Sequence, residues 1–311
     1  SFGAKIVQLM RVSSCCFSSW LMKLFALVVC ALCCDADQKC SVGTRSNGHV
    51  IEVKDSTGAS RCAAVITPVR SEPVPILFWF HGAHGNAAGC GEHPLADIAD
   101  QHGFALVCGE ALQTIFGGQW NFPAVINNKT GNPCEPGKDS YDLAYLDNVI
   151  QQLAAEPRKY NTSLLFFSGC SQGSAFSFYS GNCMKQRSPE RVSAFATHSA
   201  GLHVRGDGLR WPKALCDQCD YFPAMPQAYG DNLGLKACIF DNTEDPSAKN
   251  PSFYLSSKQL ARRWTALGNR AEEHYGPGGH CQIHNYSQIV SCLDDSTGRL
   301  SRVSSNNLIM V

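Results

Sequence analysis

Two kinds of hydrophobic segment alternate along this chain of 311 residues. Residues 76–80 and 164–167 are short runs that are apolar throughout, as in strands buried on both faces of a parallel sheet. Residues 141–155 instead place an aliphatic residue at every third or fourth position, which puts those side chains on one face of a helix. This alternation predicts an α/β fold with a mostly parallel, doubly wound sheet.

The same patterns divide most of the chain into elements. Predicted strands cover residues 49–54, 61–67, 76–80, 104–107, 164–167, 192–196, 235–240 and 272–275. Predicted helices cover residues 94–101, 141–155, 174–186, 253–267 and 286–293. In the helix over 253–267, we expect Leu255, Leu260 and Trp264 to face inward. Two long segments, an irregular one over 112–138 and a second over 201–230, are expected to form the rim of a site and to set its specificity.

The most distinctive motif is Gly169-Cys170-Ser171-Gln172-Gly173, which follows an apolar run. A G-x-S-x-G sequence between a strand and a helix predicts a nucleophile elbow, a sharp turn that lifts the serine clear of the sheet. Glycines flank the serine because a side chain there would collide with neighbouring backbone. A serine hydroxyl is a weak nucleophile, so it requires an adjacent base that is itself oriented by a carboxylate.

Candidates for that acid and base follow Ser171 in the chain, each beyond the end of a predicted strand. We favour Asp245 as the acid, because it leaves a turn after the strand end. We favour His280 as the base, because its glycine-rich loop lets the imidazole reach Ser171. The alternatives are Glu244 and Asp241 for the acid, and His274 and His284 for the base.

Backbone N–H groups must also stabilise the oxyanion of a tetrahedral intermediate. The amide of Gln172, directly after the nucleophile, is one candidate donor. The second is the amide of Ala83 in the loop after residues 76–80, with His84 as its alternative. His84 and Trp120 are also candidate substrate contacts, although packing within its own loop is the alternative for Trp120.

The N-terminal region predicts export. Met22-Lys23 precedes an apolar run over residues 24–34, and Ala36 ends a small-residue segment that suits signal-peptide cleavage. The run is short for a bilayer span, so no stable membrane span is expected, with a retained signal-anchor as the alternative. We therefore expect a leader over residues 1–36, a catalytic domain over 37–295, a disordered tail over 296–311, and a secreted protein.

Cysteine usage agrees with export. Twelve of the 17 cysteines follow the leader, and an oxidising compartment would pair them. A bridge between Cys170 and Cys281 would hold the nucleophile and the base side by side, and the alternative partner for Cys281 is Cys292. Cys216 and Cys219 predict disulfides and not a metal site, because no second pair lies at zinc-ligand spacing.

Composition limits the partners. A formal net charge of +0 provides no basic excess to neutralise phosphates, which argues against a nucleic-acid partner. The hydrophobic share of 44% supports a large core. Sequons at Asn128, Asn161 and Asn285 predict glycosylation on exposed loops. The chemistry outlined above requires neither a cofactor nor a metal.

The motifs together resemble a known group. They are Phe80-His81-Gly82, Asp142-Leu143-Ala144-Tyr145, the serine pentapeptide, Thr243-Glu244-Asp245 and Gly279-His280. In this order, over about residues 43–293, the chain resembles the secreted α/β-hydrolases of the polyhydroxybutyrate depolymerase and feruloyl/acetylxylan esterase group. The resemblance implies an α/β-hydrolase fold with Ser171, Asp245 and His280 as catalytic triad.

The Cys-Ser, Asp, His-Cys arrangement is also similar to that of fungal tannases and their feruloyl esterase relatives. In those enzymes the equivalent cysteine pair is bridged, and a large lid precedes the acid, where this chain has only residues 201–230. We therefore expect a secreted serine esterase that forms an acyl-enzyme on polyester or plant-cell-wall-type esters. The alternatives are a catalytically silent binding protein of the same fold and a secreted peptidase.

Overall fold

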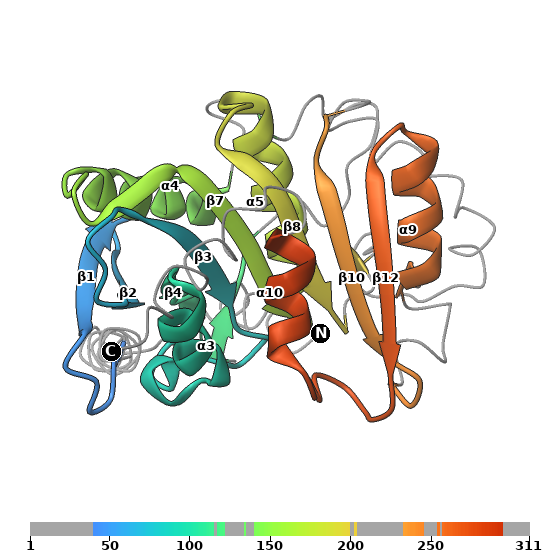
Figure 1. Cartoon of the computed structure of the whole chain (residues 1–311), viewed down its shortest axis with the longest axis horizontal. Coiled ribbons are helices and arrows are strands. Elements are labelled where there is room, and N and C mark those ends of the chain that lie inside the picture. Colours follow the sequence, from blue (N-terminus) through green and yellow to red (C-terminus); the bar gives the residue numbers. More distant parts are fainter. Residues whose placement is uncertain are drawn as a thin grey trace, which may run out of the picture. The chain divides into compact units, whose positions relative to one another are not determined.

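An eight-stranded sheet organises the computed structural model of the chain (Figure 1). The structure describes residues 40–114, 117–121, 134, 140–199, 202–203, 233–245, 254–255 and 257–294. In spatial order the strands are β1 (Gly48–Lys54), β2 (Ser60–Ile66), β4 (Ala105–Gly109), β3 (Val74–Phe80), β7 (Tyr160–Cys170), β8 (Val192–His198), β10 (Lys236–Asn242) and β12 (Arg270–Gly276).

The pairing of these strands confirms the predicted sheet. β2 pairs antiparallel with both β1 and β4, and every further neighbouring pair from β4 to β12 is parallel. The carboxyl ends of β3, β7, β8, β10 and β12 therefore meet at one edge, where their arrowheads point in Figure 1. Open α/β sheets form their sites at this edge.

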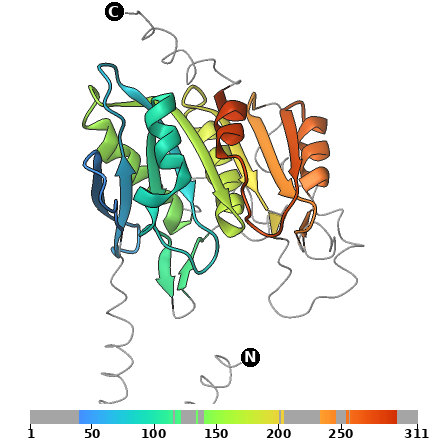
Figure 2. The same cartoon turned by 60° about the horizontal axis from the view of Figure 1, so that its bottom comes forward.

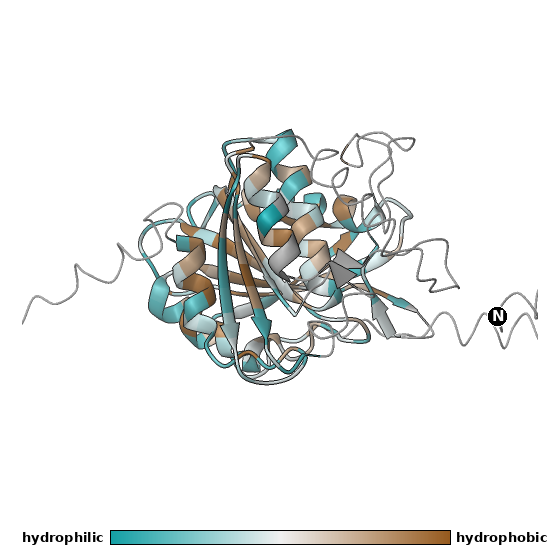
Figure 3. Cartoon of the chain, turned by 90° about the vertical axis from the view of Figure 1, so that its right-hand side faces the viewer, coloured by the Kyte–Doolittle hydropathy of each residue, from teal (hydrophilic) through white to brown (hydrophobic). Residues whose placement is uncertain are grey.

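Helices cover both faces of the sheet (Figures 1 and 2). α4 (Tyr141–Ala154), α5 (Gln172–Arg187) and α9 (Ser257–Ala266) contribute buried side chains to one hydrophobic cluster. α3 (Pro94–His102) and α10 (Tyr286–Asp294) contribute to the other, on the opposite face. Figure 3 shows the hydrophobic residues concentrated on the central strands between these layers, as the continuous apolar runs predict.

Helix ends follow the polar residues and glycines of the sequence. The Ser140 hydroxyl accepts from the Leu143 amide at 3.2 Å and caps α4. Gly103 ends α3 with φ of 71°, a left-handed conformation that glycine adopts without steric cost.

Two predicted segments differ from the structure. The segment over 112–138 is not irregular throughout, because β5 (Leu112–Thr114) and β6 (Gly117–Gln119) form a hairpin. The helix predicted from residue 253 begins only at Ser257, and Leu255 belongs to β11 (Tyr254–Leu255), which pairs with β9 (Leu202–His203). Leu260 and Trp264 are fully buried, as expected.

Five disulfides connect described residues: Cys40–Cys62, Cys90–Cys108, Cys134–Cys183, Cys170–Cys281 and Cys238–Cys292. Cys281 therefore pairs with its preferred partner. The alternative pairing with Cys292 is wrong, because Cys292 on α10 bridges to Cys238 on β10. Cys216 and Cys219 lie outside the described residues.

Several other predictions concern residues outside the described part of the chain. These are the leader over 1–36, the tail over 296–311, Asn128, and nearly all of the segment 201–230. Asn285 is exposed just before α10, whereas Asn161 is half-buried within β7 and not in a loop. Among the described residues, no helix combines the length and the apolar character needed to cross a bilayer.

Candidate active site

Ser171 lies at the turn between β7 and α5, as the pentapeptide predicts. Its backbone has φ of 56° and ψ of −121°, a region that non-glycine residues rarely occupy. The Ser171 amide donates to the carbonyl of His198 at 3.0 Å, and the Ser171 carbonyl accepts from Ser174 at 3.0 Å. A strained residue that is fixed on both sides by hydrogen bonds is typical of a functional position.

The flanking glycines are required by close backbone contacts. A Cβ at Gly173 would lie 2.1 Å from the carbonyl oxygen of Phe80, and one at Gly169 would lie 2.6 Å from the same oxygen. Neither contact can relax, because the neighbour is backbone of the central strand β3. The elbow therefore packs directly against the end of β3, which carries the other half of the site.

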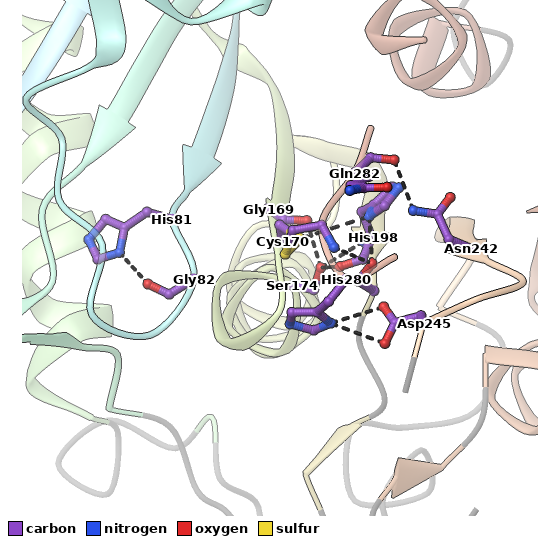
Figure 4. The surroundings of a disulfide bond; sticks show 12 residues. His81, Gly82, Gly169, Cys170, Ser174, His198, Asn242, Asp245, His280 and Gln282 are labelled. Atoms are coloured by element: carbon purple, nitrogen blue, oxygen red, sulfur yellow. Dashed lines mark hydrogen bonds and ion pairs between the residues drawn. A yellow bond between two sulfur atoms is a disulfide. The ribbon is translucent and has the colours of Figure 1, made fainter. Parts of the chain in front are cut away.

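Asp245 and His280 form a hydrogen-bonded carboxylate–imidazole pair. Nδ1 of His280 lies 2.9 Å from Oδ2 and 3.2 Å from Oδ1 of Asp245 (Figure 4). Asp245 is completely buried, whereas the side chain of His280 is 43% exposed. The carboxylate thus fixes the orientation of the imidazole and leaves its Nε2 as the nitrogen available for proton transfer.

Hydrogen bonds join the acid loop and the base loop. Nδ2 of Asn242 donates to the carbonyls of Gly279 at 2.7 Å and Gln282 at 2.8 Å, on both sides of His280. The amide of Glu244 donates to the carbonyl of Gly278 at 3.1 Å. The dyad is consequently held by its backbone as well as by the carboxylate.

The Cys170–Cys281 disulfide connects this dyad to the elbow. Its Cα atoms are 5.8 Å apart. Because Ser171 follows Cys170 and His280 precedes Cys281, the Cα atoms of Ser171 and His280 are at most about 13 Å apart. Among the described residues, no hydrogen bond joins the Ser171 hydroxyl to His280. Hydrogen bonds between a nucleophile and its base often form only when substrate is bound.

The alternative acids and bases have other contacts. Oδ1 of Asp241 accepts from the Asn242 amide at 2.8 Å. His274 lies inside β12, where Nε2 is 2.8 Å from Glu272 and the ring stacks on Phe240. Among the described residues, no hydrogen bond or ion pair joins Glu244 to a histidine or His284 to a carboxylate. Asp245 and His280 are paired with each other, so the geometry favours these two residues.

The loop after β3 lies beside Ser171. A Cβ at Gly82 would be 3.3 Å from Cβ and 3.9 Å from Oγ of Ser171. The next amide, that of Ala83, has no acceptor among the described residues, and the same holds for Gln172. The alternative donor is excluded, because the His84 amide donates to the carbonyl of Gly118 at 2.8 Å.

His81 orients the peptide that carries the Ala83 amide. The Ala111 amide donates to Nε2 of His81 at 3.2 Å, so Nδ1 carries the proton and donates to the Gly82 carbonyl at 2.7 Å. Because a trans peptide is planar, fixing this carbonyl directs the Ala83 N–H the opposite way. Burial lowers the pKa of His81 to about 4, which keeps the imidazole neutral at pH 7.

Trp120 fastens the β5–β6 hairpin to both halves of the site. Its amide donates to Oε1 of Gln172 at 3.0 Å, and its indole Nε1 donates to the His81 carbonyl at 2.8 Å. The indole is 4% exposed and stacks on Phe176 at 4.6 Å. This burial favours packing over a role in contacting substrate. The side chain of His84 is exposed beside Gln119.

A cavity of about 140 Å³ is lined in part by His81. Its lining includes Trp79, Ala87, His93 and the Cys90–Cys108 disulfide. Burial lowers the pKa of His93 to about 4. The lining is therefore neutral and largely apolar, and the volume is close to that of a cavity that accommodates a benzene ring.

Within the described residues, one group of side chains has the proximity that a metal site requires: Glu272, His274 and Cys292. The Cys292 thiol is consumed by its bridge to Cys238, and Glu272 is paired with Lys236 at 2.7 Å. This group therefore lacks the free thiolate that would ligate a metal.

Sequence reasoning missed three contributors: His81, the side chain of Gln172, and the His198–Ser199 pair at the end of β8. The signal for the last was available, since polar residues at the carboxyl end of a parallel strand mark the functional edge. The roles of His81 and Gln172 depend on contacts with residues 30 and 52 positions away and have no local signal.

The chain matches no protein-family model and none of the curated proteins. Solved structures do share its fold. A ferulic acid esterase superposes with a TM-score of 0.56 at 15% identity, covering 81% of this chain and 98% of that one. An S-formylglutathione hydrolase from Agrobacterium tumefaciens gives 0.53 at 15% identity, covering 82% and 94%. FphF, a fluorophosphonate-binding serine hydrolase of Staphylococcus aureus, gives 0.50 at 12% identity, covering 81% and 98%.

Proposed function

Because these similarities show the α/β-hydrolase fold, we propose that the chain is a serine hydrolase of carboxylic esters that acts through an acyl-enzyme. The observation that carries the proposal is the buried Asp245 paired with His280 at 2.9 Å, on a loop that a disulfide joins to the Ser171 elbow. This arrangement provides the nucleophile, base and orienting acid of acyl transfer.

The reaction follows from the roles of these atoms. Oγ of Ser171 attacks the ester carbonyl while Nε2 of His280 takes its proton, and Asp245 stabilises the resulting imidazolium through Nδ1. The amides of Ala83 and Gln172 donate to the oxyanion. Collapse expels the alcohol, which receives the proton from His280. Water, deprotonated by the same imidazole, then releases the acid and restores Ser171.

The substrate class is the finer part of the proposal. We assign polyester or plant-cell-wall-type esters, such as hydroxybutyrate oligomers and feruloyl or acetyl sugar esters. The motif resemblance supports this class, and so does the likeness to a ferulic acid esterase.

We further propose that the protein is secreted and glycosylated. The apolar run over residues 24–34 supports a signal peptide, and disulfides of this number are typical of oxidising compartments. Expression of the chain with residues 1–36 present, followed by peptide mass mapping of the culture medium and of the cells, tests both points. A mature terminus near Asp37 and a glycan on exposed Asn285 are expected, and retention of residues 24–34 would contradict secretion.

Ester turnover tests the function. Purified protein is assayed with p-nitrophenyl acetate and butyrate, and then with feruloyl, acetyl-sugar and hydroxybutyrate esters. We expect Ser171→Ala to abolish turnover, while Ser180→Ala, which removes a buried hydroxyl in the middle of α5, leaves it unchanged. Retained turnover in Ser171→Ala would overturn the proposal. Cleavage of peptides but not esters would identify a peptidase instead.

A further inference from the structure

The end of β8 lies between the nucleophile and the acid. β8 is the neighbour of both β7 and β10, and His198 is in register with Cys170 on one side and Phe240 on the other. Ser199 follows directly. These two residues are the point in the sheet from which the elbow, the acid strand and the base loop can all be reached.

His198 holds the elbow through its backbone. Its carbonyl accepts from the Ser171 amide at 3.0 Å, and its amide donates to Oγ of Ser174 at 2.7 Å. Oγ of Ser174 also lies 2.6 Å from the Gly169 carbonyl, to which it donates. His198 therefore contacts Ser171 directly and, through Ser174, the Gly169 carbonyl that precedes it. Figure 4 shows His198, Ser174 and Gly169.

Ser199 contacts the acid strand β10 and the loop that carries His280. Its amide donates to the Phe240 carbonyl on the acid strand at 3.1 Å. Its hydroxyl accepts from the Cys281 amide, adjacent to the base, at 2.9 Å. The same hydroxyl is hydrogen-bonded to Nδ1 of the buried His198 at 2.9 Å, which fixes its rotamer.

Backbone strain marks the same contact. Ser199 has φ of 52° and Cys281 has φ of 58°, so both partners of the hydroxyl–amide bond are in the left-handed region. A residue other than glycine rarely adopts this backbone conformation, which persists only where surrounding contacts impose it. Such strain at two residues joined by one hydrogen bond is unexpected for simple packing.

We propose that Ser199, with its rotamer fixed by His198, is a positioning residue that sets the separation of Ser171 and His280 in parallel with the disulfide. The inference rests on the proposed function, since it assigns how that triad is assembled. The disulfide acts through the side chains of Cys170 and Cys281, whereas Ser199 acts on the Cys281 amide, so the two connections use different atoms.

The test compares Ser199→Ala, Ser199→Gly and the control Ser180→Ala. The control also removes a buried hydroxyl, but one that donates to the Phe176 carbonyl within its own helix. We expect kcat to fall about 10- to 100-fold in both Ser199 variants, with KM within about twofold, because a lost positioning contact misplaces the base. Glycine relieves the positive φ, so a residue that mattered only for backbone strain would tolerate Ser199→Gly.

Two further readouts make the result decisive. Combining Ser199→Ala with Cys170→Ala/Cys281→Ala lowers kcat by more than the product of the separate losses, because each connection partly substitutes for the other. Hydrogen exchange of the Cys281 amide, which needs no activity, becomes at least about tenfold faster in Ser199→Ala and Ser199→Gly but not in Ser180→Ala.

Wild-type-like kcat in both Ser199 variants, or unchanged Cys281 exchange, would overturn the inference. An inactive wild-type protein would instead contradict the proposed function. Hydrogen exchange of the Cys281 amide would then test by itself whether Ser199 holds the base loop.

Discussion

Removal of the Cys170–Cys281 bridge is expected to affect catalysis more than stability alone explains. The bridge spans 111 residues of sequence, and loop-closure entropy assigns it about 5 kcal/mol of the free energy of unfolding. The Cys134–Cys183 bridge spans 49 residues and is assigned about 4 kcal/mol. The two double alanine variants therefore form a pair with nearly equal expected destabilisation.

Their positions relative to the site differ. Cys170 and Cys281 each adjoin a reacting residue, whereas Cys183 lies about 16 Å along α5 from Gln172. We expect Cys170→Ala/Cys281→Ala to lower kcat about 10- to 100-fold for p-nitrophenyl butyrate, because the base is less well placed while Ser199 still holds its loop. The Cys134→Ala/Cys183→Ala control, although similarly destabilised, keeps kcat within about twofold.

Both variants are first unfolded in urea to measure the loss of stability, and kcat is then measured where each is fully folded. Equal kcat values in the two variants would refute the claim that the bridge positions the triad, and would reduce it to a stabilising crosslink.

Three further results are expected. Asp245→Asn lowers kcat by about 10⁴, because the wrong histidine tautomer is held, whereas Glu244→Gln leaves kcat unchanged; the reverse outcome would exchange the two assignments. Gln172→Met keeps the backbone amide but loses the side-chain hydrogen bonds to Trp120 and Gln119, so we expect kcat to fall about tenfold at constant KM. An unaltered kcat would show that the β5–β6 hairpin does not position the Gln172 amide. The free energy of unfolding is also expected to fall as the pH drops from 6.5 toward 4. Burial lowers the pKa values of His81, His93 and His198 to about 4, so in this window the unfolded state binds more protons than the folded state. Each histidine then lowers the free energy of unfolding by about 1.4 kcal/mol per pH unit. Burial raises the pKa of Asp142 to about 6, so this carboxyl takes up a proton on folding below that pH, and its contribution offsets that of about one histidine. Urea unfolding at pH 7, 5.5 and 4.5 measures the net loss of stability. An unfolding midpoint that does not change with pH would contradict the prediction.

Much of the fold was accessible from sequence because the central strands are apolar along their whole length. Residues 76–80 and 164–167 have no polar position that could face water, so they predicted strands covered on both faces, and both are central in the sheet. The start of α9 was not predicted correctly, because Leu255 continues the apolar pattern although it pairs with β9.

Sequence patterns identified candidate site residues that follow strands, and did not identify residues whose contacts are with distant parts of the chain. Ser171, Asp245 and His280 each lie just beyond a strand end, which made them candidates. Trp120 was ambiguous, because its burial depends on Phe176 in a helix more than 50 residues later. Ser199 was missed because its partner, the Cys281 amide, belongs to a segment 82 positions further along the chain.

The proposed fold chemistry makes one serine hydroxyl nucleophilic by placing it beside an oriented imidazole. Peptide mapping after treatment with a fluorophosphonate probe tests it most directly. We predict a single covalent adduct on Ser171, formed at least about 100-fold more slowly in His280→Ala and absent from Ser171→Ala. No adduct in the folded wild-type protein, or an adduct on a different serine, would contradict it.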